Sequence, residues 1–558
     1  MSEELNRKVG ARLGELSKVL GSGSITPQAL APLVTNTVGV SPLKPTVLEV
    51  VRDDESLLVK RQRAATAPPA EQRGVEALAN QLRELLGTHT GDGVPRVKFK
   101  VFRIEMDSAE AQRVTTLQYM ELVTADTKGP HEQHATWTIE WQLGDGPPRI
   151  ASVSSRDYQA THARLGPSRT LFSDCTESAL GANACWRSQL TRGMNHWLWR
   201  SQDSEPTSHT GIPGLAVGDV DGDGLDDLLL TQSAGLPNRL LLQNEDGTAR
   251  DVSAQWGVDW IDGSRGALFV DWDNDGDRDL VVATLGNVVL AENIEQRRFE
   301  IREVLPVGDD TTSLSAADYD RDGRVDLYVC AYRADQDLRR GRAEVISGGS
   351  AQRFIVYDAD NGQPNHLFRN VADWKFRDVT AEVGLDAGND RFSFIGVWED
   401  YDDDGDPDLY VANDYGRDNL YENHRQADGT HRFVEISEEL GEAGVAFGMG
   451  ATWGDYDRDG RSDLYVSNMW SAAGNRITFQ PRFKADNPDA RRTLQRLAQG
   501  NNLLRNEGGG RLSPVERASG AFMGRWAWAP RFVDIDNDGW EDLVVANGFV
   551  STEDPGDL

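Results

Sequence analysis

The amino-acid sequence predicts a mainly β protein of repeated small sheets, preceded by a smaller α+β domain. Three observations support this prediction. An acidic motif recurs six times in the second half of the chain, a short apolar segment follows each copy, and the first part of the chain lacks the motif. Repeats of about 50 residues are typical of folds in which one supersecondary unit stacks against the next.

The acidic motif reads D-x-D-x-D-G-x-x-D-L. Its six copies begin at Asp219, Asp271, Asp318, Asp400, Asp455 and Asp534. They start 52, 47, 82, 55 and 79 residues apart, and the shorter intervals match one four-stranded propeller blade. The two long intervals predict insertions, near residues 331–362 and near residues 470–500. We therefore expect a β-propeller over residues 211–558.

Each copy of the motif runs into a segment typical of a buried strand. The continuations are LLLTQ, LVVAT, LYVCA, LYVAN, LYVSN and LVVAN. They are short, apolar and rich in β-branched or aromatic residues. Four repeats share a later segment, which reads NRLLLQN at 238–244, NHLFRN at 365–370, DNLYEN at 418–423 and NNLLRN at 501–506. The constant order of loop, strand, turn and strand predicts one small sheet per repeat.

The acidic loops have the composition of calcium sites. Positions 1, 3, 5 and 9 of every copy are Asp, so the chain groups 24 carboxylates into six clusters of four. Carboxylates packed closely repel one another, and hard oxygen ligands in an irregular loop suit Ca²⁺. The glycine at position 6 permits a sharp turn, and the carbonyl group of position 7 can supply another oxygen. Six structural Ca²⁺ ions would add 6 × 2 charges and change the net charge from −32 to −20.

The predicted metal ligands are therefore positions 1, 3, 5, 7 and 9 of each loop. They are Asp219, Asp221, Asp223, Leu225, Asp227, Asp271, Asp273, Asp275, Asp277, Asp279, Asp318, Asp320, Asp322, Arg324, Asp326, Asp400, Asp402, Asp404, Asp406, Asp408, Asp455, Asp457, Asp459, Arg461, Asp463, Asp534, Asp536, Asp538, Trp540 and Asp542.

The acidic motif has two alternatives to a structural calcium loop. An EF-hand begins with a similar pattern, but it needs a Glu at position 12 and flanking helices. Position 12 is Leu or Val in all six copies. Acidic hairpin turns without metal are the other alternative, and six copies with identical Asp positions favour metal binding over it. Because no loop adds a His or an open position, we expect a structural role for the metal.

Several segments of the second half resemble the FG-GAP/VCBS repeats of integrin α-subunit-like propellers. They are GMGATWGDYDRDGRSDLYVSNM at 448–469, NDYGRDNLYEN at 413–423 and GRWAWAPRFVDIDNDGWEDLVVANG at 524–548. They are most similar to the family related to cartilage acidic protein, also called ASPIC/UnbV-associated. The resemblance implies a propeller, usually of seven blades, with calcium between the first two strands of a blade. It also implies an extracellular or envelope setting and adhesion or scaffolding rather than catalysis.

The last repeat differs from the others. The chain ends soon after the strand that follows the sixth loop, so the outer strands of that blade are not apparent. Either residues before 211 complete this blade by ring closure, or the gene model is truncated.

The first part of the chain predicts an α+β domain over residues 1–165, followed by a connector over 166–210. Segments 26–34 and 71–87 have apolar residues at helical spacing. Four later segments alternate like strands with one buried face, at residues 96–106, 113–124, 134–143 and 149–159. Helices followed by an antiparallel meander resemble the cone-shaped NTF2-like fold.

Two groups of residues in this part are chemically suggestive. His131 and His134 lie near Glu132 at the start of a strand, which fits either a metal or acid/base cluster or, as we favour, a solvated loop. Cys175 and Cys185 either form one disulfide or remain thiols, and the cysteines have no zinc-site spacing.

The charge distribution restricts the partners. A net charge of −32 excludes general binding to nucleic acid or to an anionic membrane. No segment is long and apolar enough to span a bilayer, and the N-terminus has no apolar core of signal-peptide type. Residues 470–500 carry six basic against two acidic side chains, and residues 331–353 carry five against three. Either these basic insertions bind a protein or glycan partner, or they only cover the propeller face.

Together these features predict a calcium-stabilised binding, adhesion or scaffolding protein in an extracellular, periplasmic or cell-surface setting. The sequence contains no nucleophile elbow, phosphate-binding loop, HExxH motif or paired-cysteine zinc site. The alternative function is that of a carbohydrate-active enzyme, a lyase or hydrolase. Its site would lie in the propeller funnel or in the N-terminal domain.

Overall fold

The computed structural model describes residues 2–63, 72–87, 94–106, 112–126, 129–166, 172–193, 196–197, 214–308, 310–332, 359–515 and 519–548. The chain divides into two compact units. Unit 1 comprises Met1–Ser173 together with Ser471–Ala498, and unit 2 comprises Asp174–Trp470 together with Gln499–Gly556. The fold is mainly β, with an α+β region at the N-terminus and a series of repeated sheets after it.

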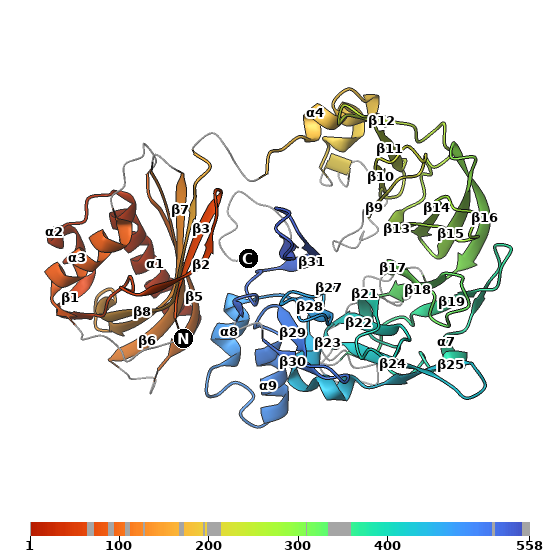
Figure 1. Cartoon of the computed structure of the whole chain (residues 1–558). Helices are drawn as coiled ribbons and strands as arrows, with labels where there is room; N and C mark the ends of the chain where they lie inside the picture. The colour runs from red at the N-terminus through yellow and green to blue at the C-terminus, as the bar shows by residue number, and fades with distance from the viewer. Residues whose placement is uncertain are drawn as a thin grey trace. The chain divides into compact units, whose positions relative to one another are not determined.

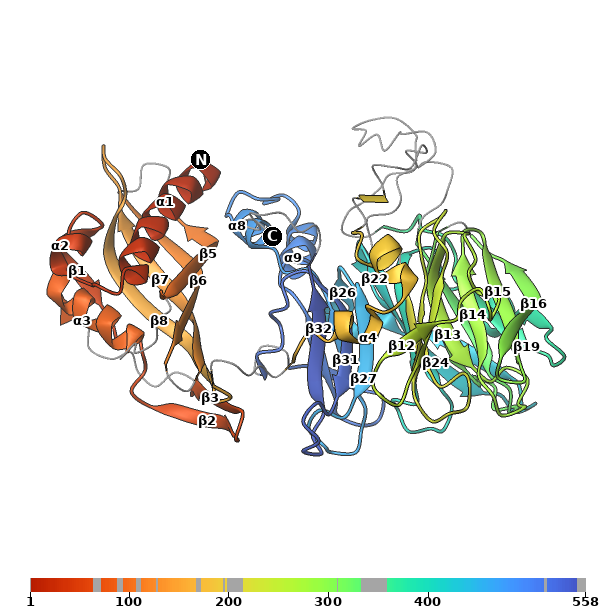
Figure 2. The same ribbon diagram turned by 90° about the horizontal axis from the view of Figure 1, so that it is seen from above.

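Unit 1 contains an eight-stranded sheet with helices on one face (Figures 1 and 2). The helices are α1 (Ser2–Gly21), α2 (Pro27–Leu30) and α3 (Val75–Leu86). The strands are β1 (Val34–Val40), β2 (Leu48–Asp53), β3 (Leu57–Gln62), β4 (Gln72–Arg73), β5 (Arg96–Glu105), β6 (Arg113–Ala125), β7 (Pro130–Gln142) and β8 (Arg149–Ala163). Strands β5 to β8 form an antiparallel meander, and β8 also pairs with β3 and, in parallel, with β1.

The meander and α3 occupy the segments in which the sequence predicts them, but the sheet is larger than the four strands expected. Strands β1 to β4 and helix α1 were not predicted. Helix α1 has the required pattern, because its buried residues Leu13, Leu16 and Leu20 follow helical spacing. They belong to the same apolar core as Trp137 and Trp141 of β7.

The insertion near residues 470–500 belongs to unit 1, although it lies in sequence between two strands of unit 2. It contains α8 (Ala472–Thr478) and α9 (Pro488–Arg496). Arg476 is 3% exposed, donates to the Val101 carbonyl over 2.8 Å and pairs with Glu3 over 3.3 Å. The Arg103 guanidinium lies 3.9 Å from the centre of the Phe479 ring. One of the basic side chains that could bind a partner, Arg476, is therefore engaged inside unit 1.

Unit 2 repeats one antiparallel sheet. Five described sheets have four strands and a sixth has two. The strands are β9 (Leu215–Gly218), β10 (Asp227–Leu230), β11 (Arg239–Gln243) and β12 (Ala249–Asp251); β13 (Ser264–Val270), β14 (Asp279–Thr284), β15 (Asn287–Ile294) and β16 (Arg298–Pro306); β17 (Thr311–Ala317), β18 (Asp326–Ala331), β19 (His366–Asn370) and β20 (Phe376–Asp378); β21 (Phe392–Glu399), β22 (Asp408–Asp414), β24 (Asn419–Arg425) and β25 (His431–Glu435); β27 (Gly450–Gly454), β28 (Asp463–Ser467), β29 (Asn502–Asn506) and β30 (Leu512–Pro514); and β31 (Ala527–Val533) with β32 (Asp542–Asn547).

Shorter elements connect or flank these sheets. They are α4 (Thr176–Leu180), a π-helix (Trp186–Leu190), α7 (Thr380–Val383), a 3₁₀ segment (Ser437–Gly444) and the pair β23 (Gly416–Arg417) and β26 (Val445–Ala446). Residues 174–193 of the expected connector belong to unit 2. There the Asn183 amide donates to the Ala249 carbonyl over 2.7 Å. Residues 333–358, which include most of the insertion near 331–362, lie outside the described residues.

The sheets of unit 2 stack face to face through their second strands. Residues Leu280 and Val282 of β14 face the core shared with the first sheet, whereas Val281 and Ala283 face the core shared with the third. Because side chains alternate along a strand, burial on both faces requires the continuous apolar segments seen in the sequence. The first strands of successive sheets contact one another in order, and the sheets follow an arc (Figures 1 and 2).

A buried asparagine on the third strand links each of four sheets to the sheet before it. Its side-chain amide donates to the carbonyl at position 2 of the preceding acidic loop, over 2.7 to 2.9 Å. The four pairs are Asn293 with Val220, Asn370 with Trp272, Asn423 with Tyr319, and Asn506 with Tyr401. Neighbouring repeats are therefore joined by polar contacts as well as by apolar packing.

Removing one of these amides is expected to destabilise unit 2. In Asn370→Ala the buried Trp272 carbonyl loses its partner, which costs about 1–3 kcal/mol of unfolding free energy. The measurement is a urea titration followed by circular dichroism. Gln426→Ala is the matched control, because it removes an exposed hydrogen bond from a side-chain amide to the His424 carbonyl. We expect the unfolding free energy of this control to change by less than about 0.5 kcal/mol. Equal effects in the two variants would contradict the role of the buried link.

Candidate metal sites in the acidic loops

All six acidic loops occupy the same place in their sheets. Each loop joins the first strand to the second. In the second sheet, β13 ends at Val270, immediately before position 1, and β14 begins at Asp279, which is position 9. The same two boundaries recur in the other five sheets. The predicted ligands therefore lie in a turn that is anchored by a strand at each end.

Backbone N–H groups hold the carboxylate at position 1. The glycine N–H at position 6 donates to it over 2.8 to 3.0 Å in every loop. At position 7 the backbone N–H donates to the carboxylate of position 5, over 2.8 to 3.1 Å. These contacts turn the acidic side chains toward the inside of the loop.

Two positions of each loop have a left-handed backbone. The glycine at position 6 has φ between 83° and 97° in all six loops, where a residue with a Cβ is strained. Position 4 also has a positive φ throughout, at Gly222, Asn274, Arg321, Asp403, Arg458 and Asn537. Sequence reasoning identified the first of these turns and missed the second, because position 4 varies in residue type.

The carboxylate at position 9 is the most buried member of each of the first five loops. Asp227, Asp279, Asp326, Asp408 and Asp463 are at most 2% exposed. Each accepts the backbone N–H of a residue on the third strand, over 2.8 or 2.9 Å. One side chain thus connects the acidic loop, the second strand and the third strand.

Several of these carboxylates have an oxygen without a hydrogen bond. Among the described residues, the Oδ2 atoms of Asp326, Asp408 and Asp463 are buried and have no hydrogen-bond partner. The same holds at position 3 for the Oδ1 atoms of Asp221, Asp320 and Asp457. A buried carboxylate oxygen with no hydrogen bond costs free energy of folding unless a cation balances its charge.

The electrostatic state of the loops agrees with this geometry. Burial, with the nearby aspartates of the same loop, raises the pKa of Asp326 and of Asp408 to about 8. The same causes raise the pKa of Asp279 to about 7. Positions 1, 3 and 9 place one oxygen each within 4.8 Å of the others in the first three loops, and positions 1, 3 and 5 do so in the fourth. Several of the acidic loops can therefore hold a metal ion.

The six loops differ in two neighbouring side chains. In the third and fifth loops, position 7 and the facing third-strand position are both arginine, as Arg324 with Arg369 and Arg461 with Arg505. Arg369 lies 2.6 Å from the carboxylate of Asp320, and Arg505 lies 2.7 Å from that of Asp457. In each of these two loops an arginine side chain therefore already lies beside the carboxylate of position 3.

The second and fourth loops have acidic residues at the same two places. They are Asp277 with Glu292 in the second loop and Asp406 with Glu422 in the fourth. Asp277 has its pKa raised to about 6 by burial and by the surrounding aspartates and Glu292. Asp406 lies 3.7 Å from Arg321 of the third loop, a more distant contact than those of Arg369 and Arg505. The sequence alone did not reveal this alternation, because it depends on which third-strand residue faces the loop.

The other candidate residues from the sequence lie outside the acidic loops, the histidines in unit 1 and Cys175 and Cys185 in unit 2. His134 pairs with Glu132 over 3.1 Å and both are about half exposed, as expected for a solvated segment. His131 instead contacts Asp126 and His162. Cys175 and Cys185 are thiols, the first exposed and the second buried, and burial raises the pKa of Cys185 to about 11.

A model of the FG-GAP-like repeat matches residues 219–282, 271–329, 400–466 and 494–545. The chain carries FG-GAP-like repeats. Each matched stretch includes at least one acidic loop, and together the four stretches include all six. FG-GAP-like repeats arranged as many small antiparallel sheets fit a propeller-like binding or scaffold protein. None of the described helices is both long and apolar enough to cross a membrane.

No curated protein matches the chain. Among solved structures, an Agrocybe aegerita lectin that recognises non-reducing terminal N-acetylglucosamine is 12% identical, covers 75% of this chain and 89% of its own, and has a TM-score of 0.31. A putative scytalone dehydratase from Novosphingobium aromaticivorans is 14% identical over 30% of this chain and 97% of its own, with a TM-score of 0.21. A nuclear transport factor 2-like protein from Salmonella enterica is 10% identical over 30% and 96%, with a TM-score of 0.20.

The raised pKa values predict the pH dependence of the metal-free protein. Burial raises the pKa of Asp408 to about 8 in the folded chain, from an ordinary value of 3.8. The folded state then binds more protons than the unfolded state between these values, so stability falls as pH rises from about 4 to about 8. We expect Asp408→Asn to make this slope shallower by about 1 kcal/mol per pH unit.

The measurement is urea unfolding at several pH values after complete removal of metal. Asp428→Asn is the control, because the pKa of Asp428 is lowered by hydrogen bonds from Thr430 and its carboxyl titrates below the window. An unchanged slope in Asp408→Asn would show that this aspartate is ionised in the metal-free fold.

Proposed function

We propose that the chain is a calcium-stabilised, propeller-like binding or scaffold protein. The observation that carries this proposal is the buried carboxylate at position 9, which recurs in the first five loops. In Asp326, Asp408 and Asp463 one oxygen of this carboxylate has no hydrogen-bond partner among the described residues. A cation at this place would balance the charge of the loop and keep the first two strands of each sheet together.

The donor set fits calcium better than a transition metal. The loops offer carboxylate and carbonyl oxygens and no imidazole or thiolate at the predicted ligand positions. Calcium accepts six to eight oxygens in an irregular geometry, whereas zinc favours nitrogen and sulfur ligands. Positions 1, 3, 5 and 9 would supply side-chain oxygens and position 7 a backbone carbonyl, with about six ions for the six loops. Such ions supply charge and rigidity and take no part in a reaction.

A calcium requirement suggests where the protein works. Loops of this kind are filled in millimolar calcium, so we place the protein outside the cell, in the periplasm or at the cell surface. We propose a propeller, usually of seven blades in the cartilage acidic protein-related (ASPIC/UnbV-associated) family that the sequence resembles. A protein or glycan is the proposed partner, with adhesion or scaffolding as the role and the exposed Arg482 as one contact point in the insertion near 470–500.

Removal of calcium is expected to lower the thermal stability of unit 2 strongly. A site filled at one hundred times its dissociation constant adds about 2.7 kcal/mol to the unfolding free energy. The measurement is thermal unfolding in millimolar Ca²⁺ and in excess chelator, with metal counted in the purified protein. Asp408→Asn should lower the calcium count by one, and the exposed control Asp428→Asn should not. Equal unfolding temperatures with no calcium bound would refute the proposal.

The arginine alternation predicts two classes of calcium affinity. The second and fourth loops should bind more tightly than the third and fifth, because Arg369 and Arg505 already neutralise part of the charge. We expect Arg505→Met to raise the calcium affinity of the fifth loop roughly tenfold, which corresponds to about 1.4 kcal/mol. Competition with a chromophoric chelator measures this change. Arg511→Met removes an exposed arginine from the turn between β29 and β30 and serves as control, and weaker binding in Arg505→Met would contradict the prediction.

A further inference from the structure

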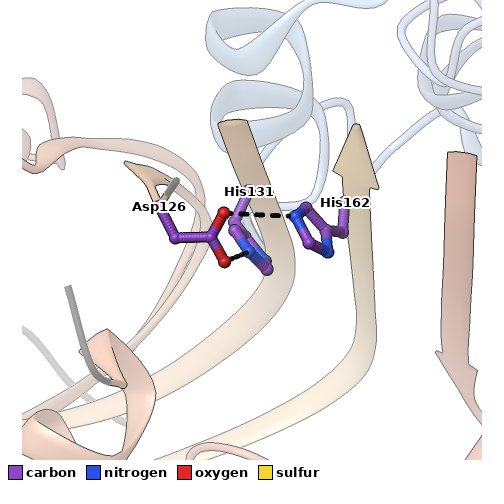
Figure 3. A group of neighbouring side chains, drawn as sticks. All are labelled: Asp126, His131 and His162. Atoms are coloured by element: carbon purple, nitrogen blue, oxygen red, sulfur yellow. Dashed lines mark hydrogen bonds and ion pairs between the residues drawn. The ribbon is translucent and has the colours of Figure 1, made fainter. Parts of the chain in front are cut away.

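A second group of metal-ligand side chains lies in unit 1, far in sequence from the acidic loops. It consists of Asp126, His131 and His162, at the ends of three neighbouring strands (Figure 3). Asp126 follows the end of β6, His131 is near the start of β7, and His162 is near the end of β8. The two histidines are direct partners across the β7–β8 pair, so the antiparallel register brings their rings together.

The three side chains converge on one point. The Nε2 atom of His131 lies 3.0 Å from Oδ2 of Asp126, and the Nε2 atom of His162 lies 3.5 Å from Oδ1. The imidazole rings are stacked, with centroids 3.5 Å apart and an angle of 18° between their planes. One ligand atom from each residue lies within 4.8 Å of the other two. Ligand atoms of a tetrahedral zinc site, with bonds of about 2.0–2.1 Å, lie roughly 3.3 Å apart.

The surroundings of these three side chains favour the binding of a metal ion. Asp126 is oriented by a turn in which its N–H donates to the Gly129 carbonyl over 3.0 Å and the Gly129 N–H donates to its Oδ1 over 3.1 Å. The Nε2 atom of His162 is buried and makes no hydrogen bond within the described part of the chain, although it lies 3.5 Å from the Asp126 carboxylate (Figure 3). Burial, followed by the proximity of His131, lowers the pKa of His162, which favours the neutral imidazole that metals bind.

We propose that Asp126, His131 and His162 bind one divalent transition-metal ion of the zinc class. Two imidazoles and one carboxylate match this class, whereas calcium and magnesium prefer oxygen alone. Three protein ligands leave one position of a tetrahedral ion for water or another ligand. The site is independent of the acidic loops in residues, ligand type and metal, so it does not depend on the calcium proposal.

His134 provides a matched control on the same strand. Its position three residues from His131 places it on the opposite face of β7, where it pairs with Glu132 and is half exposed. A histidine that binds metal only through general surface affinity would behave alike at both positions.

The test is a titration of the full chain with Co²⁺ in saturating Ca²⁺, which fills oxygen-only sites beforehand. We expect one equivalent of Co²⁺ to give the visible absorption of a tetrahedral nitrogen-containing site, and Zn²⁺ to displace it. His131→Ala and His162→Ala should each weaken binding by at least tenfold, and His134→Ala should not. Circular dichroism of each variant reports whether it folds, and Asp126→Asn tests the site with an isosteric change. Absence of the band in the wild type, or an equal band in all variants, would overturn the proposal.

Discussion

A buried aspartate ties three separate stretches of each repeat together in unit 2. In the second sheet Asp279 begins the second strand and accepts the N–H groups of Trp272 in the loop and Asn293 on the third strand. Its side chain is shielded from water, so its charge has to be met by hydrogen bonds or by a cation. The left-handed glycine and the inward-facing carboxylates of the loop are arranged around this one group.

The same constraint extends from sheet to sheet. The residue that donates its backbone N–H to position 9 is Asn in four of the sheets, and its side chain reaches the loop of the sheet before it. A change in one acidic loop is therefore expected to affect the stability of its own sheet and of the sheet that follows it. Repeat proteins with contacts of this kind gain stability from nearest-neighbour terms rather than from one central core.

Much of this arrangement was predictable from the sequence, because six nearly identical motifs reveal a common loop and common strands. The pattern identified positions 1, 3, 5 and 9 and the apolar second strands. It did not identify the left-handed position 4, which tolerates Arg321 and Arg458 despite their side chains. The pairing of Arg369 and Arg505 with the loops also required the strand register, which residue spacing alone does not contain.

Similar reasons apply to unit 1. Strand β4 has two residues, both exposed, and β2 has no fully buried residue, so neither shows the alternation that makes β5 to β8 recognisable. The sequence groups His131 with His134 because they are close along the chain, but a spacing of three on a strand places their side chains on opposite faces. The partner of His131 is His162, which only the antiparallel pairing of β7 and β8 could identify.

The discontinuity of unit 1 has a consequence for the order in which the chain is made. Residues 471–498 leave the ribosome after most of unit 2, yet Arg476 fills a place beside Glu3 and Val101. Unit 1 therefore cannot complete these contacts until more than three hundred residues beyond its sheet have been synthesised. Domains generally fold as units during synthesis, whereas completion of unit 1 depends on a segment made after most of unit 2.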